Sequence, residues 1–206
     1  MIKRFFCLLC VLLAAVPALA ATPQVMMVLG DSLSAGYGID VDRGWVALMR
    51  QRLAQEGYPY EVVNASISGD TTAGGLARLP AALAEHHPEI VLIELGANDG
   101  LRGQSLPQMR RNLSAMIELA RRQHARAVIF EMRLPPNYGQ TYVNVFRQSF
   151  TDVAKAEKVP MVPFFLDDIA GDPKNFQADG LHPVEAEQSK LLDAVWPTLR
   201  PLLKKK

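Results

Sequence analysis

The chain contains very little cysteine. Its two cysteines, Cys7 and Cys10, both lie close to the amino terminus. They fall inside a segment with the pattern of an export signal, so we expect the mature chain to contain none. A mature chain without cysteine excludes disulfide bonds, a cysteine nucleophile and a thiolate metal site together.

The chain also lacks an apolar run long enough for a membrane-spanning helix. Lys3 and Arg4 form a basic start, residues 5–16 form a short apolar run, and Ala18-Leu19-Ala20 is a pattern that signal peptidase cleaves. A spanning helix needs ~20 apolar residues, and no second apolar run approaches that length. We therefore expect a signal peptide over 1–20 and a mature domain over 21–206. That domain would be periplasmic or secreted, with no stable membrane insertion; an uncleaved anchor is the alternative.

An excess of positive charge is missing as well. The formal net charge is +1 at pH 7, and loss of Lys3 and Arg4 with the signal peptide would change it to −1. Because nucleic-acid-binding domains usually carry a basic face, we expect no nucleic-acid partner. The mature length suffices for a single apolar core without disulfides, and we expect a monomer.

Motifs for cofactors are absent. No His-x-x-x-His or Glu-x-x-His pair stands in a helical pattern, no G-x-G-x-x-G follows the first apolar run, and no phosphate loop ends in Gly-Lys-Ser/Thr. The G-x-S-x-G elbow of α/β-hydrolases is missing too. We expect no cofactor and no metal. A catalytic metal remains the alternative, because four residues are of ligand type: Asp31, Asp99, Asp179 and His182.

Apolar runs alternate with amphipathic stretches along the mature chain. The predicted buried strands are 25–29, 61–64, 90–95, 127–132 and 159–164, the last at a sheet edge because of its prolines. The predicted helices are 45–56, 75–85, 107–123, 142–158 and 184–203. This alternation predicts one three-layer α/β/α domain around a mainly parallel five-stranded sheet.

Polar segments follow the first three predicted strands. Gly30-Asp31-Ser32 follows the first, residues 65–70 follow the second, and Gly96-Ala97-Asn98-Asp99 follows the third. Ligands in such sheets bind at the carboxyl ends of the strands, which meet along one edge. We therefore expect these segments to form one site.

Ser32 and His182 are the predicted nucleophile and base. A serine hydroxyl at a strand-to-helix turn is exposed, but it needs an adjacent base to become nucleophilic. Asp179 lies three residues before His182, and Pro183 is expected in the first turn of the final helix. Such a carboxylate can accept the imidazole Nδ1–H and set the tautomer. The alternatives are a helix N-cap for Ser32 and a surface-loop histidine for His182.

Gly69 and Asn98 are the predicted partners of a developing oxyanion. Gly69 can offer a backbone N–H where a Cβ would obstruct an acyl group. Asn98 can add a side-chain N–H, and the Ser32 amide can supply a third donor. An ordinary turn glycine and an Asx-turn are the alternatives for Gly69 and Asn98, and the sequence leaves both open.

At these positions the chain resembles the SGNH (GDSL) hydrolase family, which is named for its Ser, Gly, Asn and His. The matching segments are GDSLSAGYG, VVNASISGDTT, ELGANDGLRG, RLPPNYG and DGLHP. The resemblance covers essentially the whole mature chain and extends to bacterial periplasmic thioesterases, lysophospholipases and arylesterases. It implies a flavodoxin-like sheet of order 2-1-3-4-5. It also implies a triad of Ser32, Asp179 and His182, with an oxyanion hole of Ser32, Gly69 and Asn98.

The activity implied by this resemblance is hydrolysis of carboxylic esters and thioesters through an acyl-enzyme on Ser32. The substrate would be a small-molecule acyl thioester, aryl ester or lysophospholipid, and the sequence ranks none of them. The alternative is a non-catalytic module that binds acyl or glycan groups on the same scaffold. Such a module is expected to have lost a residue of the triad, whereas all three are present here.

Residues after the third and fourth predicted strands are expected to hold the substrate. These segments should flank Ser32, and their apolar members suit an acyl chain. The predicted substrate-binding residues are Leu101, Leu134, Pro135 and Tyr138, with Gly36 and Tyr37 as further candidates.

Overall fold

A computed structural model describes residues 24–205, so the predicted signal peptide lies outside the described residues. All strand pairs of its single five-stranded sheet are parallel, in the order β2-β1-β3-β4-β5. This is the order that the resemblance implies. The strands are β1 (Gln24–Gly30), β2 (Tyr60–Asn64), β3 (Ile90–Glu94), β4 (Arg126–Phe130) and β5 (Met161–Val162).

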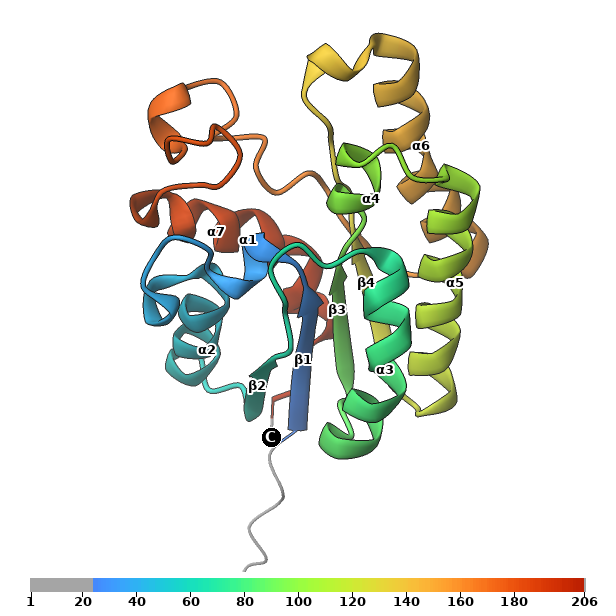
Figure 1. The fold of residues 1–206 in the computed structure, drawn as a ribbon. Coiled ribbons are helices and arrows are strands. Elements are labelled where there is room, and N and C mark those ends of the chain that lie inside the picture. Colours follow the sequence, from blue (N-terminus) through green and yellow to red (C-terminus); the bar gives the residue numbers. More distant parts are fainter. Residues whose placement is uncertain (1–23, 206) are drawn as a thin grey trace, which may run out of the picture.

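Helices cover both faces of the sheet, which confirms the predicted three-layer α/β/α domain. α2 and α7 lie together on one face, and α3, α5 and α6 lie side by side on the other (Figure 1). The helices are α1 (Ser32–Ala35), α2 (Trp45–Gln55), α3 (Thr72–His86), α4 (Ala97–Leu101), α5 (Leu106–Arg122), α6 (Gln140–Glu157) and α7 (Gln188–Leu199). Short 3-10 turns span Val41–Arg43, Pro136–Tyr138, Pro173–Asn175, Glu185–Glu187 and Arg200–Leu202.

The central strands are apolar because both of their faces are covered. Every residue of β3 is buried, as are the last five residues of β1. Aromatic side chains fill the space between the sheet and the α2–α7 layer. The centroid of the Phe130 ring lies 5.9 Å from that of Trp45 and 5.3 Å from that of Phe165. Within residues 24–205, no helix is both long and apolar enough to span a bilayer.

Most predicted boundaries differ from the structure by only one or two residues, and three elements need a physical explanation. β5 lies at the sheet edge as expected but has only two residues, because Pro160 and Pro163 cannot donate ladder hydrogen bonds. α3 begins at Thr72 instead of residue 75, since the Thr71 side chain accepts from the Gly74 N–H and caps the helix. The final helix begins only at Gln188.

Pro183 therefore lies outside the first turn of the final helix, contrary to expectation. It forms an isolated antiparallel bridge with Phe176, and a 3-10 turn separates it from α7. The bridge closes the loop that carries His182. Pro183 is thus part of the closure of this loop and does not start a helix.

Candidate active site

The turn between β1 and α1 presents Ser32 at the carboxyl edge of the sheet. α1 begins at Ser32, and Asp31 is the residue that caps it, because its side chain accepts from the Leu33 N–H at 3.0 Å. The capping role considered for Ser32 thus belongs to Asp31. The Ser32 hydroxyl is left to bond a residue from the far end of the chain.

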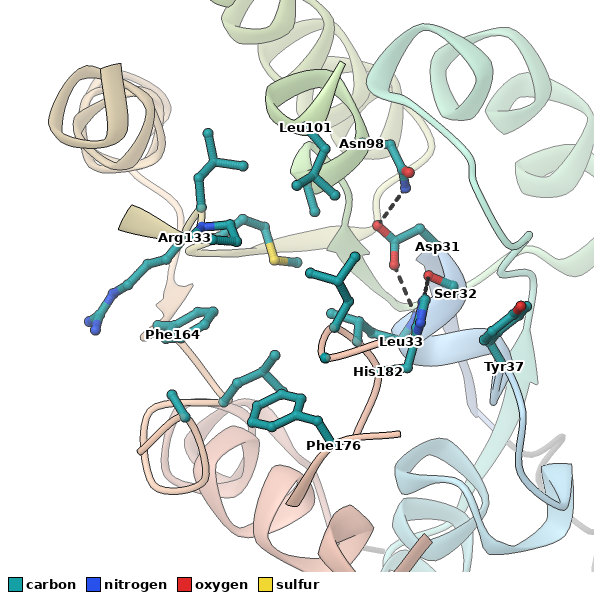
Figure 2. A pocket seen from close by; sticks show the side chains of 18 of the residues that line it. Asp31, Ser32, Leu33, Tyr37, Asn98, Leu101, Arg133, Phe164, Phe176 and His182 are labelled. Carbon is teal, nitrogen blue, oxygen red and sulfur yellow. Dashed lines mark hydrogen bonds between the residues drawn. The ribbon is translucent and has the colours of Figure 1, made fainter. Parts of the chain in front are cut away.

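That residue is His182, which lies beside Ser32 in Figure 2. Its Nε2 is 2.7 Å from Ser32 Oγ, across a sequence separation of 150 residues. Its Nδ1 is 2.7 Å from Asp179 Oδ2. The structure therefore brings the three predicted residues together in the order carboxylate, imidazole and hydroxyl.

Asp179 also organises the backbone of its own loop. Its Oδ1 accepts the backbone N–H groups of Leu181 at 2.8 Å and of His182 at 3.0 Å. Partial burial raises the pKa of Asp179, but hydrogen bonds from these two amides and from the His182 ring outweigh it and lower the pKa to about 2. Asp179 is thus a carboxylate at neutral pH. It can hold a proton on Nδ1 and leave Nε2 free to accept one from Ser32.

The loop that carries His182 is tied to the segment after α1. The Gln177 side chain donates to the carbonyl oxygens of Tyr37 at 2.8 Å and Pro183 at 3.2 Å. The Tyr37 ring lies against the imidazole, with 4.5 Å between ring centroids (Figure 2). These contacts restrict the position of the imidazole relative to the Ser32 turn.

Gly69 reaches the same site from the loop after β2, and Asn98 reaches it from the start of α4. Gly69 has a φ of 78°, which favours glycine, and its carbonyl accepts from Arg102 Nη2 at 2.9 Å. Asn98 lies in the first turn of α4 and donates from Nδ2 to Asp31 Oδ2 at 3.0 Å (Figure 2). Its side chain thus bonds a distant residue and forms no Asx-turn.

A largely apolar cavity of about 940 Å³ adjoins Ser32. Ser32 and His182 lie on one side of it, whereas Arg133 and Phe164 lie on the opposite side (Figure 2). Four of the expected substrate-binding residues line the cavity: Tyr37, Leu101, Leu134 and Pro135. A space of this size and character suits an acyl chain.

Tyr138 and Gly36 are not among the cavity-lining residues. Tyr138 ends a 3-10 turn, remains 39% exposed and donates its hydroxyl to the Leu101 carbonyl at 3.2 Å. Gly36 is the left-handed C-cap of α1. Tyr138 thus contacts the lining residue Leu101, and Gly36 precedes the lining residue Tyr37.

Most of one cavity wall was not predicted from the sequence. Much of it comes from the segment between β5 and α7, which has no regular periodicity. Its apolar composition just after a strand is the signal that could have identified it. The missed lining residues include Met132, Phe164, Leu166, Ala170, Pro173 and Phe176.

The side chains considered as metal ligands have other partners. Asp179 and His182 bond each other, Asp31 bonds Leu33 and Asn98, and Asp99 accepts two hydrogen bonds from Thr72. Within residues 24–205, no three His, Cys, Asp or Glu side chains are grouped as a metal site would require.

Comparison with known proteins adds several close similarities. The model of the GDSL-like lipase/acylhydrolase family matches residues 28–186. The chain is 54% identical to esterase TesA of Pseudomonas aeruginosa over 183 residues, which cover 89% of this chain and 91% of that protein. It is 40% identical to thioesterase 1/protease 1/lysophospholipase L1 of Escherichia coli, covering 89% and 87%.

A solved structure shares the same architecture. The psychrotrophic esterase EstA from Pseudoalteromonas, described as inhibited by monoethylphosphonate, superposes with a TM-score of 0.83. It is 38% identical to this chain, and the match covers 87% of this chain and 98% of that one.

Proposed function

This chain belongs to the GDSL-like lipase/acylhydrolase family, and from that premise we propose that it hydrolyses esters and thioesters through an acyl-enzyme on Ser32. One observation carries the assignment of roles. Asp179, His182 and Ser32 form a continuous hydrogen-bonded series that ends beside an apolar cavity. A hydroxyl, a base and a space for the acyl group are the parts that such a reaction needs.

The first half of the reaction forms the acyl-enzyme. Ser32 Oγ attacks the acyl carbon while His182 Nε2 takes its proton, and Asp179 stabilises the imidazolium. The negative oxygen of the tetrahedral intermediate accepts from the amides of Ser32 and Gly69 and from the Asn98 side chain. His182 then gives the proton to the leaving alkoxide or thiolate, and the carbon–oxygen or carbon–sulfur bond breaks.

The second half releases the acid. His182 takes a proton from a water molecule, and the resulting hydroxide attacks the ester carbon on Ser32. The same three donors stabilise the second tetrahedral intermediate. Its collapse breaks the bond to Ser32 Oγ, which recovers its proton from His182.

The cavity supports an acyl chain as the buried part of the substrate. Its lining combines aliphatic and aromatic side chains from the loops after β3, β4 and β5, including Leu101, Leu134 and Phe164. Burial of each methylene contributes about 0.8 kcal/mol, so a long chain would bind well there. The Escherichia coli relative is named a thioesterase and a lysophospholipase. These names support acyl thioesters and lysophospholipids as substrates of this chain, in addition to aryl esters.

We also propose that residues 1–20 direct export and that the mature enzyme acts in the periplasm or outside the cell. The basic start, short apolar run and Ala18-Leu19-Ala20 pattern support this assignment. Amino-terminal sequencing of the protein from a periplasmic fraction should begin at Ala21. An intact Met1 terminus in that fraction would contradict cleavage.

The proposed mechanism needs no cofactor, since proton transfer and charge stabilisation are both assigned to side chains and amides. Dialysis of the purified enzyme against a chelator should leave kcat unchanged. Loss of activity that zinc or manganese reproducibly restores would contradict this part of the proposal.

A fluorophosphonate probe tests the nucleophile directly. The wild-type protein should be labelled, Ser32→Ala should remain unlabelled, and Ser114→Ala on α5 serves as the matched control that keeps labelling. His182→Ala should lose several orders of magnitude in kcat without loss of fold. A wild-type protein that resists the probe would favour the non-catalytic binding module.

A further inference from the structure

Two buried carboxyl groups beside Ser32 take no part in the reaction as described. Asp31 is 1% exposed and Glu94 is fully buried. Glu94 ends β3 in register with Gly30 of β1, and a Cβ on Gly30 would lie 2.6 Å from Glu94 Oε2. The glycine of the Gly30-Asp31-Ser32 turn thus leaves the space in which the Glu94 carboxyl lies.

Glu94 bonds the residues on either side of the nucleophile. Its Oε2 accepts the Ser34 hydroxyl at 2.6 Å and the Asp31 backbone N–H at 3.3 Å. Its Oε1 has no hydrogen-bond partner among the described residues. Burial, and then the charge of Asp31, raise the pKa of Glu94 well above its ordinary range. The raised pKa favours the protonated form of Glu94, and its two hydrogen bonds hold the residues on either side of Ser32.

Asp31 bonds the oxyanion hole from the same turn. Its Oδ1 accepts from the Leu33 N–H and its Oδ2 accepts from Asn98 Nδ2, both at 3.0 Å. Burial raises the pKa of Asp31 to about 6, although the Leu33 hydrogen bond opposes the rise. At pH 7 to 8 this group is therefore mostly a carboxylate, which only accepts hydrogen bonds.

An acceptor-only partner decides the orientation of the Asn98 amide. The nitrogen must face Asp31, because the amide oxygen in that place would meet a negative charge. The amide nitrogen carries two hydrogens, and Asp31 takes one of them. The second hydrogen remains for another acceptor, and Asn98 lines the cavity that Ser32 also lines.

We propose that Asp31 is a positioning residue of the oxyanion hole, which orients the Asn98 amide toward the oxyanion, and that Glu94 holds Asp31 and Ser34 in place. Nucleophile and oxyanion donor would then be set by one buried network that joins β1, β3 and α4. The inference rests on the proposed acyl transfer at Ser32, since Asp31 acts only through Asn98.

A double-mutant cycle tests whether Asp31 acts through Asn98. With p-nitrophenyl butyrate, Asp31→Ala and Asn98→Ala should each lower kcat about 10²-fold, with KM changed less than about threefold. In the Asn98→Ala background, Asp31→Ala should lower kcat by less than about a further fivefold. If the kcat of the double variant is instead about 10⁴-fold below that of wild type, the two residues act independently and the inference is overturned. Asp40→Ala, which removes the cap of the exposed turn Val41–Arg43, is the matched control and should leave kcat unchanged.

Conservative variants keep the test informative if Asp31→Ala folds poorly. Asp31→Asn has one acceptor oxygen and cannot serve both Leu33 and Asn98, so kcat should fall at least about tenfold. Glu94→Gln keeps the shape of the side chain and an oxygen that can accept from Asp31 and Ser34, so its kcat should stay near that of wild type. Glu94→Leu removes that acceptor, so its kcat should fall. Equal losses in the two Glu94 variants would remove Glu94 from the proposal.

Failure of the inference and failure of the proposed function give different results. If the wild-type protein is labelled by the fluorophosphonate and Asn98→Ala lowers kcat, the function stands whatever Asp31 does. If the wild-type protein is unlabelled and inactive on esters, the function itself is wrong.

Discussion

At the scale of the residue, Asp179 uses its two oxygens for two different tasks. Oδ1 accepts two backbone N–H groups and shapes the loop, while Oδ2 holds the His182 ring. The same hydrogen bonds that shape the loop keep the carboxyl ionised, because they stabilise its charged form. The shape of the loop and the tautomer of His182 are therefore set by one side chain.

Replacement of Asp179 by asparagine should separate these tasks. The amide oxygen can still accept from the backbone, but the amide nitrogen cannot accept the Nδ1–H of the required tautomer. By analogy with other triads, kcat should fall on the order of 10³- to 10⁴-fold while Tm changes little. Saturating kinetics and a thermal melt check this, and a large fall in Tm with a modest loss of kcat would contradict it.

The acid limb of the activity profile should not come from Asp179. Its pKa is lowered to about 2, so it becomes protonated only as the pH falls toward that value. Its contribution to stability is present above its unfolded pKa of about 4 and is lost as the pH falls through about 2. Any stability that wild type gains over Asp179→Asn from this charge should therefore shrink only as the pH falls from about 4 toward about 2. A divergence near pH 6 would contradict the assignment.

Glu94 should give the opposite pH dependence. Its raised pKa means that the folded protein keeps a proton which the unfolded chain releases above about pH 4.3. Stability from this group is full below that value and falls by about 1.4 kcal/mol per pH unit until the folded pKa is reached. Glu94→Gln removes the slope, so its Tm should decline less than that of wild type as the pH rises from about 4.3 toward the folded pKa of Glu94. Parallel declines in Tm would contradict a neutral Glu94.

The range above pH 6 isolates Glu94 from its neighbour. Asp31 contributes a slope of the same sign, but only up to its folded pKa of about 6. Wild type and Glu94→Gln both carry Asp31, so a difference in the pH dependence of their Tm above pH 6 is caused by Glu94.

At the scale of the element, the short helix α4 connects the loops of the site. Asn98 bonds Asp31 of the Ser32 turn, and Asp99 accepts the Thr72 backbone N–H at 2.8 Å and its hydroxyl at 2.5 Å. Arg102, just after α4, bonds the Gly69 carbonyl at 2.9 Å. One turn of helix therefore fixes the Ser32 turn and the Gly69 loop relative to each other.

Thr72→Val should weaken this connection. Its methyl fills the space of the hydroxyl but leaves Asp99 Oδ1 and Asn112 Nδ2 without their Thr72 partner in a buried site. The free energy of unfolding should fall by about 1–3 kcal/mol. Each kcal/mol should lower Tm by about 2–4 °C in a domain of this size. kcat should also fall, because Gly69 and Asn98 are no longer held at one spacing. Thr72→Ser keeps the hydroxyl and is the control; equal effects of the two variants would point to packing alone.

Most elements could be predicted from the sequence because the strands are buried on both faces and read as apolar runs. β5 and the start of α7 could not be predicted, since proline removes ladder donors at Pro160 and Pro163 and three residues before Gln188 form a 3-10 turn. That Ser32 and Asn98 line the same cavity could be expected from parallel topology, since both follow the carboxyl ends of neighbouring strands. The hydrogen bond from the Asp31 backbone N–H to Glu94 could not be expected, because it depends on the register that pairs Gly30 of β1 with Glu94 of β3. The catalytic roles themselves stay predictions.

At the scale of the whole molecule, the three loops after β3, β4 and β5 enclose the cavity on the side of Ser32 away from β2. Lengthening the acyl chain of p-nitrophenyl esters should raise kcat/KM about three- to fourfold per methylene until the cavity is full. Substrates must be kept below their critical micelle concentrations. Lengthening the alcohol of alkyl butyrates should have a much smaller effect, and the reverse pattern would place the alcohol in the cavity.

The distance along the chain between Ser32 and His182 has a consequence for biosynthesis. The sheet is complete at Val162, but the imidazole arrives only with the loop after β5, 150 residues beyond the hydroxyl that it bonds. A chain that ends before residue 182 carries the proposed nucleophile but not its proposed base, and it also lacks the core residues that α7 supplies. On the proposed mechanism, hydrolysis therefore requires nearly the whole domain, and a chain truncated before its last loop should have no esterase activity.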